Sequence, residues 1–162
     1  MKLVVQRVDN ASVDVNNETV GKIEKGYMVL VGIRENDTKE QADYLVKKLI
    51  NLRIFEDENG KMNLNIKDVQ GELLLISQFT LYADTSNGNR PSFTNAEKSE
   101  KANELYEYFC NKCNEQIHVE KGIFGEHMEI SLKNNGPVTI ILERWTWGQR
   151  IWYLGTEDLS QI

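Results

Sequence analysis

Residues 2–33 carry four stretches with the composition of β-strands, and the breaks between them are short. The stretches lie at 2–8, 11–15, 19–23 and 27–33, with Asn16-Asn17 and Gly26 at two of the breaks. Strands that follow one another this closely pair most simply as antiparallel hairpins. The chain is therefore expected to begin as β-sheet.

Two amphipathic helices are predicted further along. Asp37-Thr38 offers an N-cap, with Gln41 at capping-box distance from Thr38. Thr94 and Glu97 offer a second capping box, before a helix that extends to about residue 116. The apolar stripes, each at helical spacing, are Ala42, Leu45, Val46, Leu49 and Ile50, and then Ala102, Leu105, Tyr106, Phe109 and Cys113.

Strand-like stretches also lie at 52–55, 73–76, 128–133 and 138–142, and the composition of 84–92 is that of a loop. No repeat, linker or low-complexity segment interrupts this order. The alternation of strands and helices predicts a single α/β domain. We expect mixed, largely antiparallel β-sheets with two helices packed on one side, in β/β/α layers.

Composition excludes several classes of protein. Of 162 residues, 40% are hydrophobic and 27% charged, and no apolar run is long enough to cross a bilayer, so disorder and membrane spanning are poor interpretations. The net charge of −6 argues against a broad basic surface that binds nucleic acid electrostatically. A nucleic-acid partner must then be held locally, as when one RNA end enters a pocket. The start of the chain lacks a signal peptide's apolar region, which predicts a cytoplasmic protein.

Common catalytic and metal motifs are absent from the sequence, which contains no GxxxxGK[ST], GxGxxG, GxSxG or HExxH. Cys110 and Cys113 form a CxxC that, with His118 and His127, offers four potential zinc ligands. The pair falls within the second predicted helix, and Cys113 belongs to its apolar stripe. Buried thiols are the better interpretation, and we expect no metal and no cofactor.

Two polar clusters remain. Ser77-Gln78-Phe79-Thr80 follows a buried strand, at the kind of strand end where ligands often bind, although Ser and Thr there can simply terminate the strand. Asn134-Asn135-Gly136-Pro137 lies between two strands. Considered alone it is an ordinary β-turn, because most X-Pro bonds are trans.

Taken together, the motifs of this chain resemble those of the D-aminoacyl-tRNA deacylase family, the D-Tyr-tRNA deacylase type of bacteria and eukaryotes. Their order and spacing agree from residue 1 to about residue 142. The motifs are VQRV at 5–8, ASV at 11–13, NLRIF at 51–55, KMNLN at 61–65, SQFTL at 77–81, RPSF at 90–93, FG at 124–125 with Met128, and NNGPVT at 134–139.

The resemblance implies a homodimer that hydrolyses the ester between a D-amino acid, or glycine, and the 3′-terminal adenosine of tRNA. This is a chiral proofreading activity in translation quality control. It implies a cis Gly136-Pro137 bond that enters the partner subunit's pocket, where the two carbonyls hold the α-amino group and Arg7 supports the loop. Ser77, Gln78, Phe79 and Thr80 are expected to surround the ester, and Phe124 and Met128 the terminal adenine.

The residue inventory suits this chemistry. An activated ester needs a positioned water and oxyanion stabilisation more than a strong protein nucleophile, so a missing Ser-His-Asp triad is no objection. Nothing in the motif supplies a base to activate Thr80, for which a positioning role is favoured. The resemblance implies that the RNA 2′-hydroxyl activates the water.

Two departures from the family pattern stand out. The usual turn has Asp where this chain has Asn135, and bacterial relatives end soon after 138–142. We expect a deacylase domain at 1–142 and a Trp-rich extension at 143–162 that is not a separate domain; Trp145, Trp147 and Trp152 are expected to pack on the domain or at the dimer surface. The alternatives are a non-catalytic tRNA 3′-end binding protein on the same fold, and an interaction module without a pocket.

Overall fold

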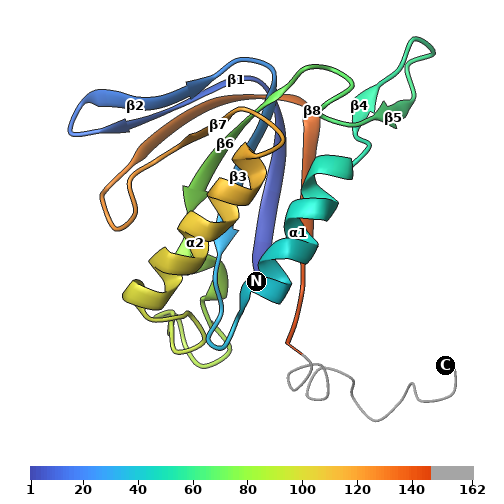
Figure 1. Cartoon of the computed structure of the whole chain (residues 1–162). Coiled ribbons are helices and arrows are strands. Elements are labelled where there is room, and N and C mark those ends of the chain that lie inside the picture. The colour runs from blue at the N-terminus through green and yellow to red at the C-terminus, as the bar shows by residue number, and fades with distance from the viewer. Residues whose placement is uncertain (147–162) are drawn as a thin grey trace, which may run out of the picture.

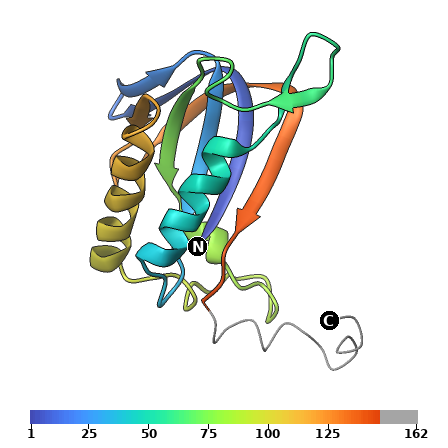
Figure 2. The ribbon, with the colours of Figure 1, turned by 45° about the vertical axis from the view of Figure 1, so that its right-hand side comes forward.

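The computed structural model describes residues 1–146. Two helices lie side by side on one face of a curved sheet (Figures 1 and 2). In chain order the elements are β1 (Lys2–Val15), β2 (Glu18–Ile23), β3 (Gly26–Gly32), α1 (Lys39–Asn51), β4 (Phe55–Glu56), β5 (Met62–Leu64), β6 (Glu72–Ser77), the 3₁₀-helix η1 (Phe79–Tyr82), α2 (Ser99–Asn114), β7 (Val119–Lys121) and β8 (Glu129–Glu143).

The main sheet is mixed, as predicted. Its order is β2-β1-β3-β6-β7, with β8 paired to the other edge of β1. The pairs of β1 with β2, β3 and β8 are antiparallel, whereas β3–β6 and β6–β7 are parallel. The β1–β2 hairpin closes through Asn16 and Asn17, both at positive φ, a conformation that Asn tolerates in tight hairpin turns.

The first helix begins where the sequence predicted. Thr38 is its N-cap, and Gln41 returns the hydrogen bond in a capping box. The second capping box is wrong: α2 begins at Ser99 with Lys98 as N-cap and no side-chain cap. The Glu97 carboxylate instead accepts hydrogen bonds from the backbone N–H groups of Asn36 and Lys98. The predicted strand at 52–55 is also wrong for residues 52–54, which connect the end of α1 at Asn51 to β4 at Phe55–Glu56.

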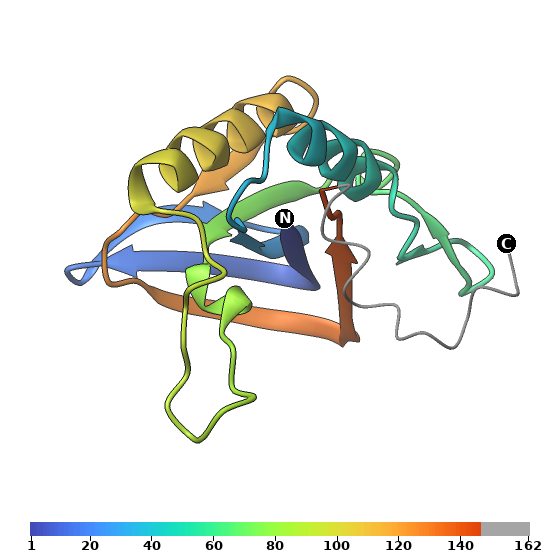
Figure 3. The same cartoon turned by 90° about the horizontal axis from the view of Figure 1, so that it is seen from below.

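The sheet has an apolar cluster on each face. One lies against the helices and takes alternate residues of β3 and β6, among them Val29 and Leu75. The other lies on the opposite face and takes Met28, Leu74 and Ile76. Strand β6 is thus buried on both sides, which explains its continuous apolar run. Seen from below, the helices and the β8 arm lie on opposite sides of β1 and β2 (Figure 3).

Strand β1 replaces the two predicted strands at 2–8 and 11–15. Leu3 and Val5 face the helices, whereas Ala11 and Val13 belong to the second cluster. Since alternate residues of a strand share a face, this change needs an irregularity, and the β1–β8 register shifts on both sides of Val8. The predicted break between residues 8 and 11 corresponds to this irregularity, but β1 continues through it.

The end of the described chain packs against its beginning. Backbone hydrogen bonds join Met1 and Arg144, and the Met1 ammonium also lies 2.6 Å from a carboxylate oxygen of the buried Asp37. Trp145 is half-buried with the Arg34 guanidinium 4.7 Å from its ring centroid. Trp147 and Trp152 lie outside the described residues. No helix in residues 1–146 is long and apolar enough to cross a membrane.

Candidate active site

A cleft of about 640 Å³ opens where β6 ends. Ser77, Gln78 and Phe79 form one side of it, and Phe124 and Met128 another. Three of the four sequence-predicted ester residues and both predicted adenine residues are therefore brought together in one cavity. Thr80 does not line the cleft, but its hydroxyl accepts a hydrogen bond from Gln78 Nε2 at 2.5 Å.

The chain turns sharply out of β6 at this point. The Gln78 N–H still bonds the Val31 carbonyl at 2.8 Å, and η1 then starts at Phe79. Within residues 1–146 the backbone N–H groups of Phe79 and Thr80 have no hydrogen-bond acceptor, as is usual for the first N–H groups of a helix. They are free to bind an oxygen that carries developing negative charge.

Aromatic side chains form much of the cleft wall. Phe79 is 58% exposed, an unusual fraction for a large apolar side chain, and meets Phe93 edge to face with ring centroids 5.0 Å apart. Phe124 packs at 5.9 Å against the buried Tyr106, whose hydroxyl donates to the Leu75 carbonyl. An exposed aromatic face backed by fixed rings suits stacking with a base. Phe93 was not among the predicted site residues, although it belongs to the RPSF motif.

The second polar cluster forms a bulge in β8. Asn134 pairs with Val8 and Thr139 with Gln6, so residues 135–138 stand where β1 supplies only Arg7. The Gly136-Pro137 bond is cis, and both residues are exposed. Asn134 closes the base of the bulge by accepting from the Val138 N–H at 2.8 Å.

Gly136 is specifically required by this geometry. Its φ of +142° is rarely adopted by residues with a side chain. An added Cβ would lie 2.6 Å from Val138 Cγ2 and 2.9 Å from the Val138 nitrogen. Since one of these neighbours is backbone, the clash is not easily relieved.

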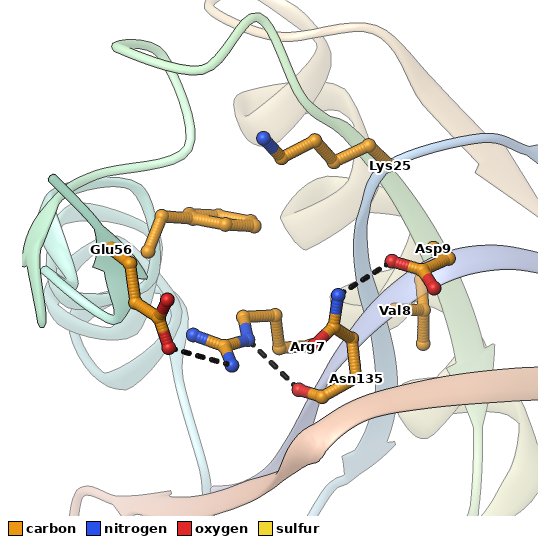
Figure 4. Close-up of a pocket in the computed structure, with 7 residues that line it drawn as sticks. Arg7, Val8, Asp9, Lys25, Glu56 and Asn135 are labelled. Carbon is orange, nitrogen blue, oxygen red and sulfur yellow. Dashed lines mark hydrogen bonds and ion pairs between the residues drawn. The ribbon is translucent and has the colours of Figure 1, made fainter. Parts of the chain in front are cut away.

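Arg7 anchors the bulge to the body of the sheet. Its Nε donates to the Asn135 carbonyl at 2.9 Å, and its Nη2 lies 3.9 Å from Glu56 (Figure 4). Its Nη1 donates to the Ile54 carbonyl at 2.6 Å. The arginine is buried, and it lines a smaller cavity of about 140 Å³ with Lys25 and Asn135 among its other residues. The structure thus places Arg7 against the residue that precedes Gly136.

The bulge and the cleft lie at opposite ends of the sheet. Ser77 pairs with Val31 at one end of β3, whereas Val8, beside the bulge, pairs with Gly26 at the other. At about 3.3 Å per residue, the intervening segment of β3 spans roughly 17 Å. Figure 1 shows β8 bending at the upper end of the sheet while the β6 arrowhead points toward the lower end. One chain does not bring the two predicted halves of the site together.

The CxxC pair shows no sign of reactivity. Both thiols are free and buried, and burial raises the pKa of Cys110 to about 12. His118 and His127 are exposed. Among residues 1–146, no group of three or more His, Cys, Asp or Glu side chains is arranged to hold a metal ion.

Comparisons with known proteins point to one family. The family model described as D-Tyr-tRNA(Tyr) deacylase matches residues 4–143. A D-aminoacyl-tRNA deacylase from Thermosipho melanesiensis is 52% identical over 145 residues, covering 88% of this chain and 97% of that protein. Another from Thermosipho africanus is 54% identical over 144 residues, with the same coverage of both chains.

Solved structures share the fold. One described as c-Myc DNA Unwinding Element Binding Protein has a TM-score of 0.85 and 41% identity, covering 90% of this chain and 100% of its own. A probable eukaryotic D-amino acid tRNA deacylase has a TM-score of 0.74 at 17% identity, covering 87% and 97%, which supports the fold alone. The family match over 4–143 and the identity with full-length relatives lead to one conclusion: this chain belongs to the D-Tyr-tRNA(Tyr) deacylase family.

Proposed function

We propose that this protein is a D-aminoacyl-tRNA deacylase, a hydrolase that cleaves the ester between a D-amino acid, or glycine, and the 3′-terminal adenosine of tRNA. The observation that carries this proposal is the match to the deacylase family over residues 4–143, with relatives of that name more than half identical. The role is chiral proofreading during translation, in the cytoplasm.

The cleft supplies electrostatic stabilisation and positioning. The ester carbonyl sits near Phe79 and Thr80, where the free backbone N–H groups bind the oxyanion as water attacks. Gln78 and Thr80 hold each other through their side chains and order the water. No base contacts the Thr80 hydroxyl among the described residues, so we assign it a positioning role rather than a covalent one. The 2′-hydroxyl of the terminal ribose activates the water.

The terminal adenine binds between the apolar side chains of Phe124 and Met128. Both line the cleft and are half-buried, so each offers surface to a ligand while staying packed against the domain. Such a pocket holds a single unstacked base by stacking and apolar contact. This local mode of binding fits a chain with a net charge of −6.

A complete site requires a second copy of the chain. The bulge of one subunit is exposed at one end of its sheet, and the cleft is open at the other. In a homodimer, Gly136 and Pro137 of one subunit enter the cleft of the other, and Arg7 supports them from behind. The exposed Ile141, at 64% the most exposed large apolar residue described, offers sheet surface for such a contact.

Selection of the D form follows from this arrangement. The Gly136 and Pro137 carbonyls accept hydrogen bonds from the substrate's α-ammonium group. The backbone then occupies the space that an L side chain requires, whereas a D side chain points away. Exclusion by backbone does not depend on side-chain identity, so several D-amino acids and glycine are substrates.

The deciding experiment compares hydrolysis of matched D-tyrosyl-, L-tyrosyl- and glycyl-tRNA by the purified protein. We expect turnover of the D and glycyl esters and an intact L ester. A non-catalytic 3′-end binder would protect both tyrosyl esters from spontaneous hydrolysis without turnover. Comparable rates on the D and L esters would refute chiral selection, and no effect on any ester would refute the deacylase assignment.

A further inference from the structure

The bulge at 135–138 lacks the usual support of a β-ladder. Its residues have no register partners in β1, and Pro137 has no N–H to donate. Whatever holds the bulge in place must therefore be side chains. Arg7 holds the backbone of Asn135, as described above, which leaves the Asn135 side chain to be explained.

Asp9 holds that side chain. The Asn135 amide Nδ2 donates to Asp9 Oδ1 at 2.7 Å (Figure 4), and the second carboxylate oxygen lies 3.5 Å from Lys133 Nζ. The pKa of Asp9 lies below its ordinary value, and the Asn135 hydrogen bond is the largest cause. Asp9 and Arg7 thus reach residue 135 from either side of Val8.

We propose that Asp9 is a positioning residue for stereochemical selection: by its hydrogen bond to Asn135 it fixes the orientation of the Gly136-Pro137 carbonyls. This inference rests on the proposed function. Arg7 restrains one atom of residue 135, and a single hydrogen bond still permits the backbone to rotate about it. The Asp9 contact adds a second point of attachment, so residue 135 is held through its backbone carbonyl and through its side-chain amide.

The identity of residue 135 matters because its partner is acidic. Asn offers an N–H to the Asp9 carboxylate, whereas Asp at 135 would place two carboxylates within hydrogen-bond distance. Like charges this close raise the pKa of one group and separate the pair at neutral pH. The sequence departure at Asn135 is therefore matched by the acid at position 9.

The test uses Asn135→Asp, Asp9→Asn and the double variant with the two residues exchanged. Since the bulge contacts the amino group rather than the reacting carbonyl, its displacement should change KM more than kcat. We expect about a ten-fold rise in KM for D-tyrosyl-tRNA with Asn135→Asp, in the range of one lost hydrogen bond to a charged group. Hydrolysis of L-tyrosyl-tRNA should increase, and the exchanged double variant should recover most of the loss.

A pH series separates positioning from general damage. In Asn135→Asp, acidification from pH 7 to pH 5 protonates one carboxyl and restores a hydrogen bond, so KM should fall toward that of the parent protein. The parent KM should change little over that range. Lys133, Arg7, Glu56 and Lys25 surround Asp9 and Asn135, and all four are retained in every variant.

Asp14→Asn is the matched control, because it removes a charge from the same strand where Asp14 accepts from Thr19. It should leave KM, selectivity and melting temperature unchanged. If the parent protein is an active, D-selective enzyme and Asn135→Asp keeps its KM and selectivity, the inference is wrong. A double variant no better than Asn135→Asp would also overturn it. An inactive parent protein would instead refute the proposed function.

Discussion

Complementation between two defective variants provides the sharpest test of a site shared between subunits. One variant carries Gly136→Ala in the bulge, where the new Cβ would meet the Val138 backbone at 2.9 Å and force the loop to move. The other carries Gln78→Ala in the cleft together with Thr80→Ala, which removes the hydroxyl that accepts from Gln78. Each homodimer then has one damaged half in every site, and we expect each to fall to about one hundredth of the parent rate or less.

Mixing the two variants should restore activity if the sites are shared. After free exchange of equal amounts, about half of the dimers contain one subunit of each kind. In such a dimer one site combines both damaged halves, and the other combines the intact cleft of one subunit with the intact bulge of the other. Half of the dimers with half of their sites intact gives about one quarter of the parent activity.

The measurement is the initial rate of D-tyrosyl-tRNA hydrolysis before and after incubation of the mixture. Light scattering checks the dimer mass, and each variant mixed with itself serves as the control. If the mixture stays at the average of the two variants although mass spectrometry shows mixed dimers, both halves of the site belong to one chain. The distance between cleft and bulge along β3 would then not imply a site shared between subunits.

Three further predictions concern single residues. Thr80→Ala should slow deacylation by no more than about 10²–10³-fold, and mass spectrometry of the parent enzyme should find no aminoacyl adduct on Thr80; an adduct would refute the positioning role. Burial raises the pKa of three tyrosines, so the folded state keeps their protons at a pH where the unfolded state releases them. The free energy of unfolding should therefore fall above pH 10, by up to about 1.4 kcal/mol per pH unit for each tyrosine. Urea denaturation at pH 9–11 should show that this free energy depends less steeply on pH in Tyr106→Phe than in the parent protein. The three are Tyr27, Tyr82 and Tyr106. Asp37→Asn should lower the free energy of unfolding by about 3 kcal/mol, because the buried Met1 ammonium loses its counter-charge; an effect as small as that of Glu58→Gln, at an exposed carboxylate, would contradict this.

Local signals in the sequence predicted local structure well. The capping box of α1 and the burial of its stripe depend on neighbours three and four residues away, and both are confirmed. The predicted boundary of α2 was wrong because a contact distant in sequence intervenes. Glu97 was expected to cap its own helix, but its carboxylate is engaged by the Asn36 N–H from a loop far away in sequence. Such competition between partners is decided only by the tertiary fold.

The candidate site likewise combines features that a local sequence signal predicts with features that only the tertiary fold determines. The motif at 77–80 predicted the cleft, because a strand that ends in polar residues leaves its last N–H groups free. The distance between this cleft and Gly136 depends on the register of β3 with both β1 and β6, which no single segment reveals. The role of Asp9 was missed for a related reason. Its partners lie in β8, and only the shifted register brings them to it.

The irregularity around Val8 connects the fold to the site. A regular β1–β8 ladder would place consecutive residues of β8 opposite consecutive residues of β1, and no loop could leave the sheet there. Two register shifts flank Val8: the one between Gln6 and Val8 lets residues 135–138 project outward. The one between Val8 and Asn10 inserts an extra residue into β1 and turns Ala11 and Val13 toward the second apolar cluster. Removing the extra residue from β1 would therefore turn Ala11 and Val13 away from that cluster. The burial of Ala11 and Val13 thus stabilises the irregularity of β1 that adjoins the exposed Gly136 and Pro137.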